Sequence, residues 1–254
     1  MAKAKKGGKP AAQVVLASKS GFLDQARQQD FSPAHLREAL EGSLRRLETD
    51  YLDLYQLHGP PLELLEQNSE ILEMLEAFVR EGKIRAWGVS LRSPDDALIA
   101  IRRLGARCIQ ANFNLLDQRA LESGLLALCE AQHVGVIVRT PLCFGFLTGA
   151  YDGAAAFDTR DHRSRWSEEQ RIRWADGARV MAEALGAIQG TLAQMALRFC
   201  LSYPAVSTAI PGMLTAAHVE ENVAASDLGP LDTDSWHCLE RLGAQDTFFV
   251  RQKP

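Results

Sequence analysis

The order of hydrophobic and polar residues along this chain alternates between two patterns, one typical of strands and one typical of helices. In residues 52–58 every second side chain falls on the same face, which indicates a strand that ends at His58. In residues 33–47 apolar side chains recur at three- and four-residue spacing, and Ser32 supplies an N-cap, which predicts a helix. The chain therefore reads as a repeating β-α chain.

The same two patterns repeat over the rest of the chain. Predicted strands cover residues 14–18, 52–58, 84–90, 108–111, 135–140 and 206–210. Predicted helices cover residues 33–47, 68–80, 94–104, 120–132, 168–185, 192–201 and 215–225. We expect these elements to form one domain over residues 13–254, preceded by a flexible basic tail of residues 1–12.

Composition and charge narrow the class of protein. The 254 residues are 46% hydrophobic and 24% charged, which is ordinary for one soluble globular domain. A net charge of −4 gives no electrostatic reason to expect nucleic acid as a partner, and no apolar run approaches membrane-spanning length. Five scattered cysteines without a C-x-x-C motif favour a cytoplasmic location over a disulfide framework or a zinc site.

Two side chains with chemical potential stand at the ends of predicted strands. His58 is followed by Gly-Pro-Pro, which must leave the sheet because proline cannot donate to a ladder. Catalytic groups of α/β barrels sit at such C-terminal strand ends, but His58 could equally cap a turn. Lys19 would point from the top of the first strand into a barrel, or extend to solvent as an ordinary strand-end lysine.

Several motifs resemble the aldo/keto reductase family and stand in that family's order. They are ASKSG (17–21), SLRRLETDYLDLYQLH before a proline (43–58), GVS (88–90), IQANFNLLD (109–117), TPLCFGFLTG (140–149) and EEN (220–222). The resemblance covers residues 14 to about 227 and implies a TIM-type (β/α) barrel that reduces carbonyls with a nicotinamide cofactor. Closing such a barrel takes eight strands, so six predicted strands imply an incomplete barrel of α/β class.

The resemblance assigns roles to the strand-end residues. Lys19 would lower the pKa of a neighbouring tyrosine acid, and His58 would orient the substrate carbonyl. Ser90 and Gln110 would hold the nicotinamide carboxamide, although Leu91 stands where asparagine is usual. A glutamine in a buried strand needs partners in any case, so a purely structural role for Gln110 stays open.

In the resemblance, a second group of residues would contact the nicotinamide ring and the pyrophosphate. Arg139 stands where the family carries an aromatic residue or an arginine that packs on the nicotinamide. The loop that follows, with Thr140, Leu142 and Gly145, resembles the family's loop over the pyrophosphate. Backbone N–H groups of such a loop can receive phosphate oxygens.

The adenine end of the cofactor has a weaker signature. Glu221 and Asn222 match the family's adenine-binding pair, or belong to a solvated helix N-terminus with favourable acidic charge. Gly212, Met213 and His218 replace the Lys, Ser and Arg that many members place around a 2′-phosphate. NAD and NADP therefore both remain possible cofactors.

The proton donor is missing from these 254 residues. They do not contain the family's G-x-x-x-x-D-[ST]-A-x-x-Y-G motif, so Lys19 and His58 are two of four catalytic groups. None of the chain's four tyrosines lies in such a motif; they are Tyr51, Tyr55, Tyr151 and Tyr203. Since a general acid contributes ~10²–10⁴ in rate, we expect NAD(P)H-dependent reduction of an aldehyde or ketone to be impaired unless another segment or chain completes the barrel.

Two other functions stay open. The chain could be a catalytically inactive nucleotide-binding or interaction protein, or a lyase or dehydratase that uses Lys19 and His58 for proton transfer. Open edges of a parallel sheet favour association, so we expect a homo-oligomer or a partner that covers them. The long polar stretch 151–166 is typical of a functional loop or of disorder.

Overall fold

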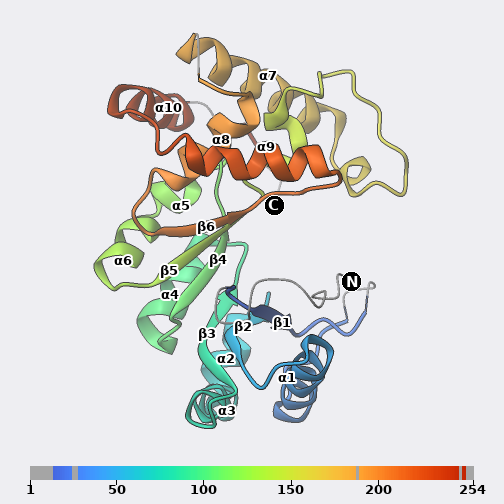
Figure 1. The fold of residues 1–254 in the computed structure, drawn as a ribbon, viewed down its shortest axis with the longest axis vertical. Coiled ribbons are helices and arrows are strands. Elements are labelled where there is room, and N and C mark those ends of the chain that lie inside the picture. The colour runs from blue at the N-terminus through green and yellow to red at the C-terminus, as the bar shows by residue number, and fades with distance from the viewer. Residues whose placement is uncertain (1–13, 25–27, 187–188, 246–247, 250–254) are drawn as a thin grey trace. The chain divides into compact units, whose positions relative to one another are not determined.

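The computed structural model of the chain describes residues 14–24, 28–186, 189–245 and 248–249 (Figure 1). The predicted basic tail of residues 1–12 lies outside this part. The chain divides into two compact units, an N-terminal unit (Met1–Gln110) and a C-terminal unit (Ala111–Pro254). Among the described residues, every helix is too short or too polar to cross a lipid bilayer.

Strands and helices alternate along the described residues. The strands are β1 (Ala17–Ser20), β2 (Leu52–His58), β3 (Ile84–Ser90), β4 (Cys108–Asn112), β5 (Gly135–Arg139) and β6 (Val206–Ile210). The helices are α1 (Pro33–Leu47), α2 (Leu62–Gln67), α3 (Ser69–Arg80), α4 (Pro94–Leu104), α5 (Arg119–Glu122), α6 (Leu125–Ala131), α7 (Glu168–Leu185), α8 (Leu192–Leu201), α9 (Ala216–Asp227) and α10 (Thr233–Gln245). The described residues also form two 3₁₀ helices, η2 (Cys143–Thr148) and η3 (His162–Arg165).

In the N-terminal unit, β1, β2, β3 and the start of β4 pair in parallel and in this order (Figure 1). One face of these strands packs on helices. The Tyr55 hydroxyl of β2 donates to the Leu36 carbonyl of α1 at 2.9 Å, and the Trp87 indole of β3 donates to Glu76 of α3 at 2.8 Å. The hydrophobic core of this unit lies between the strands and α1 and α3, and the buried polar side chains of Gln56, Ser90 and Gln110 lie on the strands' other face.

Gly88 explains how closely β3 and β4 approach. A Cβ at this position would lie 2.4 Å from the Cys108 carbonyl oxygen. Real Cβ contacts are never this short, so a larger residue would push the two strands apart. The glycine thus sets the spacing of the strands that end in Ser90 and Gln110.

In the C-terminal unit, β5 pairs with β6 in parallel, and α8 lies beside α9 (Figure 1). Trp174, Met195 and Phe199 are fully buried in its core. Arg198 is also buried, and its guanidinium donates to carbonyl oxygens at the ends of nearby segments: Gln189, Gly229 and Pro230.

The predicted α/β fold with six parallel strands is confirmed, with local corrections. The first strand is Ala17–Ser20 rather than 14–18, because pairing with β2 begins at Ala17. The single helix predicted over 120–132 is wrong: Gly124 adopts φ 76°, which ends α5 and starts α6. Helices α2 and α10 were not predicted, and Leu47, the last apolar residue of the helix predicted over 33–47, is exposed.

Candidate functional site

Four polar side chains share one face at the C-terminal ends of the strands of the N-terminal unit. Register pairs His58 with Ser90 and Ser90 with Gln110, and pairs Lys19 with Gln56 on the same face as His58. The Lys19 ammonium donates to the Gln110 side-chain oxygen at 3.1 Å. The structure therefore brings together Lys19, His58, Ser90 and Gln110, which we call the strand-end set.

The backbone and ring of His58 are held by a loop that the sequence patterns did not single out. The Phe22 ring packs edge-on against the His58 imidazole, with 4.7 Å between ring centroids. The Gln29 amide donates to the carbonyl oxygens of His58 and Gly59, at 3.2 and 3.0 Å. Gly21 lets this loop close, because a Cβ there would lie 2.3 Å from the Phe31 ring. Strand alternation could not find Phe22 or Gln29, since both lie outside a strand.

Two buried polar atoms of this face have no hydrogen-bond partner in the described part of the chain. They are the Ser90 hydroxyl and the Gln56 amide nitrogen, on residues 1% and 2% exposed. Buried polar groups are ordinarily paired, and each that is not needs a reason. A ligand carboxamide has both a donor and an acceptor for such atoms, so the face fits the amide end of a nicotinamide.

The two tyrosines of the N-terminal unit, Tyr51 and Tyr55, do not share the face and the strand end that carry His58. Tyr55 points to the opposite face of β2, toward α1, and burial raises the pKa of its hydroxyl to about 12. Tyr51 precedes β2, at the other end of the strand from His58, and the Arg85 guanidinium lies 4.5 Å above its ring. Neither residue is placed as an acid at the end of β2.

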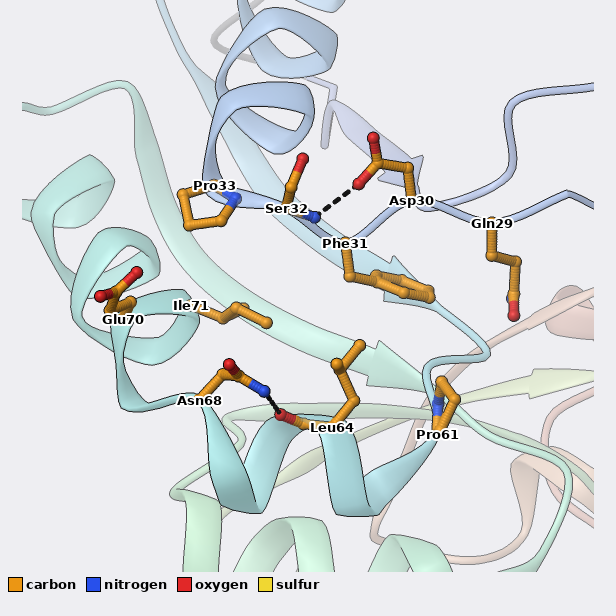
Figure 2. Close-up of a pocket in the computed structure, with 10 residues that line it drawn as sticks. All are labelled: Gln29, Asp30, Phe31, Ser32, Pro33, Pro61, Leu64, Asn68, Glu70 and Ile71. Atoms are coloured by element: carbon orange, nitrogen blue, oxygen red, sulfur yellow. Dashed lines mark hydrogen bonds between the residues drawn. The ribbon is translucent and has the colours of Figure 1, made fainter.

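A cavity of about 550 Å³ opens in the N-terminal unit between the segment that precedes α1 and helices α2 and α3 (Figure 2). Phe31, Leu64 and Ile71 project into it from three different segments, so its wall is largely apolar. Gln29, which holds the His58 backbone, also lines this cavity. The cavity thus adjoins the strand end that carries His58.

The C-terminal unit contributes a loop of unusual backbone conformation. Thr140, Cys143 and Phe144 have positive φ angles of 55°, 44° and 57°, and Gly145 has φ 97°. Asn114 anchors the start of the loop, because its amide donates to the Thr140 carbonyl at 2.9 Å. Left-handed turns of this kind gather backbone N–H groups into an anion-binding concavity. The Cys143, Gly145 and Leu147 N–H groups donate to the Thr140 and Leu142 carbonyl oxygens, so hydrogen bonds within the loop hold this conformation.

The other predicted binding residues occupy distinct surroundings. Arg139 ends β5 directly before this loop and is half-buried. The Leu142 side chain is buried and belongs to the core. On α9, Asn222 is buried, and the Glu221 carbonyl accepts a hydrogen bond from Gln194 of α8 at 3.0 Å. Both lie near the middle of α9, whose N-cap is Thr215.

Residues 2–244 match the sequence profile of the aldo/keto reductase family. This chain belongs to the aldo/keto reductase family. It is 29% identical over 240 residues to an uncharacterized oxidoreductase of Bacillus subtilis, covering 92% of this chain and 76% of that protein. It is 28% identical over 242 residues to an NADH-specific methylglyoxal reductase of Escherichia coli, covering 89% of this chain and 73% of that protein.

Solved structures agree with this membership. An aldo-keto reductase of Bacillus halodurans in its holo form has a TM-score of 0.73 at 28% identity, covering 91% of this chain and 73% of that one. A glycerol dehydrogenase of Gluconobacter oxydans has a TM-score of 0.73 at 26% identity, covering 94% and 74%. The predicted family is therefore confirmed, and with it the class of oxidoreductases that use NAD(P)H.

Proposed function

We propose that this aldo/keto reductase chain binds a nicotinamide dinucleotide and serves the NAD(P)H-dependent reduction of a small aldehyde or ketone. The observation that carries the proposal is the strand-end set, in which Lys19 is bonded to Gln110 and His58 pairs with Ser90 across two strands. A lysine, a histidine and two amide-binding groups at one strand end are the residue types that carbonyl reduction needs.

Each member of the strand-end set has a role. When bound, the dinucleotide would supply a hydride to the carbonyl carbon, and the carbonyl oxygen would take its proton from water or from an acid on a segment or chain that completes the barrel. Ser90 and Gln110 hold the carboxamide; Lys19 occupies the Gln110 oxygen, which leaves its amide N–H groups to donate. His58 orients the carbonyl, and the Phe22 ring and the Gln29 amide hold His58.

The family's motifs also assign dinucleotide contacts to residues of the C-terminal unit, and we propose these roles for them. The backbone of the loop that contains Thr140, Leu142 and Gly145 receives the pyrophosphate, and Arg139 packs on the nicotinamide. Glu221 and Asn222 hold the adenine. Gly212 and Met213 carry no cation for a 2′-phosphate, so both NAD and NADP suit the proposal.

Titration calorimetry of the purified chain with NADH and with NADPH tests this proposal. We expect weak binding of at least one of them, in the micromolar to millimolar range. No heat and no change in tryptophan fluorescence at millimolar ligand would contradict it. A strong preference for NADPH would contradict our reading of Gly212, Met213 and His218.

Nucleotide binding without turnover is the second candidate function. It is favoured because Tyr55 faces α1 and Tyr51 lies at the far end of β2, so neither supplies the acid. Methylglyoxal is a suitable test substrate, because it is named for the Escherichia coli relative. Binding of NADH together with turnover far below ~1 s⁻¹ would favour this candidate over an active reductase.

We also propose that the chain associates with itself or with a partner. In the described part, β1 pairs only with β2 and β6 only with β5, so each strand presents an open edge. Apolar side chains near these edges are exposed, including Val15 and Leu214 at 77% and 89%. Light scattering at about 1 μM, the range of modest interfaces, should detect an assembly, and a stable monomer would contradict it.

A further inference from the structure

The segment 151–166 contains the same turn twice, in two different environments. Asp158 accepts from the Arg160 backbone N–H at 2.9 Å and from its Nε at 3.0 Å, and Asp161 accepts from Arg163 at the same two distances. The Arg160 side chain is 90% exposed, whereas the Arg163 side chain is 18% exposed. Local geometry is shared, so any difference in function must come from what each arginine contacts.

Arg163 lies between two aromatic rings. Its guanidinium is 4.8 Å from the Tyr151 ring centroid and 4.4 Å from that of Phe157, and it donates to the Tyr151 hydroxyl at 2.6 Å. Hydrogen bonds to Asp161 raise the pKa of Arg163 and lower that of the Asp161 carboxyl, so both stay charged. The pair fixes the Tyr151 ring in place through a charged hydrogen bond and a cation–π contact.

The arrangement of Arg163 and Tyr151 bears directly on Gly145. A Cβ at Gly145 would lie 3.0 Å from the Tyr151 ring and 3.6 Å from a guanidinium nitrogen of Arg163. The neighbouring Phe144 ring packs near His162 and Trp166, with centroids 5.7 and 5.5 Å apart. The 151–166 segment therefore covers the part of the 140–149 loop that has positive φ angles.

We propose that Arg163 is a positioning residue for the dinucleotide pyrophosphate. Held by Asp161, it keeps Tyr151 against Gly145, so the backbone of the loop stays in its phosphate-binding conformation before a ligand arrives. The inference rests on the proposed function, since it assumes that this loop receives the pyrophosphate. Preorganised backbone raises affinity because less freedom is lost on binding, and Phe144 has no glycine-like tolerance for its φ of 57°.

This role predicts which ligands are affected. Each of the three guanidinium nitrogens of Arg163 already donates to Asp161 or Tyr151, so we expect the guanidinium to act through the loop rather than by touching phosphate. Arg163→Gln should weaken NADH and ADP-ribose equally, because both carry the pyrophosphate. Affinity for both should fall about tenfold, whereas Arg160→Gln, the matched turn, should change it less than about twofold.

Further variants separate positioning from direct charge contact. Tyr151→Leu should reproduce the loss, and the double variant with Arg163→Gln should lose no more than the larger single loss, because both act on one contact. Arg163→Lys keeps the charge but lacks the planar fork, so it should not restore binding. If charge alone mattered, Arg163→Lys would bind normally and Tyr151→Leu would be silent, which would overturn the inference.

The experiment is calorimetry of the whole chain and its variants with NADH and with ADP-ribose, joined to hydrogen exchange of residues 143–149 without ligand. We expect faster exchange of this stretch in Arg163→Gln than in Arg160→Gln, with both variants folded by circular dichroism. If the wild-type chain binds both ligands, and Arg163→Gln shows the same affinity and the same exchange rate as the wild type, the inference alone would be overturned. Failure of the wild-type chain to bind either ligand would overturn the proposed function and the inference together.

Discussion

The two candidate binding regions of this chain are built on different principles. In the N-terminal unit the candidate binding groups are side chains. They belong to Lys19, His58, Ser90 and Gln110, and the alternation of the strands fixes the face on which they lie. In the C-terminal unit, the 140–149 loop offers its main chain, and its conformation depends on contacts such as that of Arg163 and Tyr151 with Gly145. A site made of side chains is lost one group at a time, whereas a backbone site is lost when its supports fail.

The largest expected effect falls on the side chains of the N-terminal unit. A fragment or partner chain that carries D-[ST]-A-x-x-Y-G, supplied in trans, should restore the reduction of methylglyoxal. Lys19→Met or His58→Ala should then remove about 10²–10⁴ of the restored rate, because each group acts on the proton or the carbonyl. Oxidation of NAD(P)H, followed by absorbance, measures this. Restored turnover that survives both substitutions would show that the strand-end set is not the catalytic centre.

The next effect tests the backbone region. Gly145→Ala should lower stability by about 1–3 kcal/mol and abolish measurable NADH binding, because its φ of 97° and the Tyr151 ring both exclude a Cβ. Gly149→Ala is the matched control, since Gly149 also has positive φ but its Cβ would meet an atom only at 3.6 Å. Thermal melting and calorimetry of both variants decide the matter. Equal losses of binding would mean that left-handed backbone alone, and not the packing of Tyr151, shapes the loop.

How far the sequence predicted these regions follows from the same contrast. The strands of the N-terminal unit, the shared face of Gln56 and His58, and the ends at Ser90 and Gln110 could be predicted, because alternation is a local property. The support given by Phe22 to His58 could not, since it depends on how a loop folds back.

In the C-terminal unit the 140–149 motif was visible in the sequence, but its supports were not. The segment 151–166 read only as long and polar, because its aromatic residues follow no regular spacing. The D-x-R turns are alike in sequence, and only tertiary packing makes Arg163 partly buried and Arg160 exposed. The break between α5 and α6 was missed for a related reason, since an isolated glycine within an apolar pattern is compatible with a continuous helix.

A smaller effect tests the face of the N-terminal strands opposite to the strand-end set. Tyr55→Phe removes a buried hydrogen bond to Leu36 and should cost about 0.5–1.5 kcal/mol of stability without changing NADH affinity. The Tyr55 hydroxyl has its pKa raised from 10.0 to about 12 by burial, so its protonated form is favoured in the folded state. Its contribution to stability is complete below pH 10 and is lost as the pH rises through about 12.

Melting temperatures measured across this alkaline range check the prediction, with Tyr51→Phe as the control because Tyr51 precedes the strand. The wild-type chain and the control should lose stability more steeply with rising pH than Tyr55→Phe. Parallel pH profiles for all three proteins would show that Tyr55 ionises as freely in the folded chain as in the unfolded one. Reduced NADH affinity in Tyr55→Phe would place Tyr55 within the functional face and blur the distinction between the two faces.

The central claim is that the strand-end set receives the nicotinamide end of the cofactor. Its most direct test is the ratio of dissociation constants for NADH and ADP-ribose in Ser90→Ala, with Ser20→Ala as control. Both serines are buried, but Ser20 pairs with Leu57 and faces the opposite side of the strands. Ser90→Ala should weaken NADH roughly threefold to tenfold, the worth of one hydrogen bond, and leave ADP-ribose unchanged, while Ser20→Ala changes neither. Equal affinity of wild-type and Ser90→Ala chains for NADH, or an equal loss for both ligands, would contradict the claim.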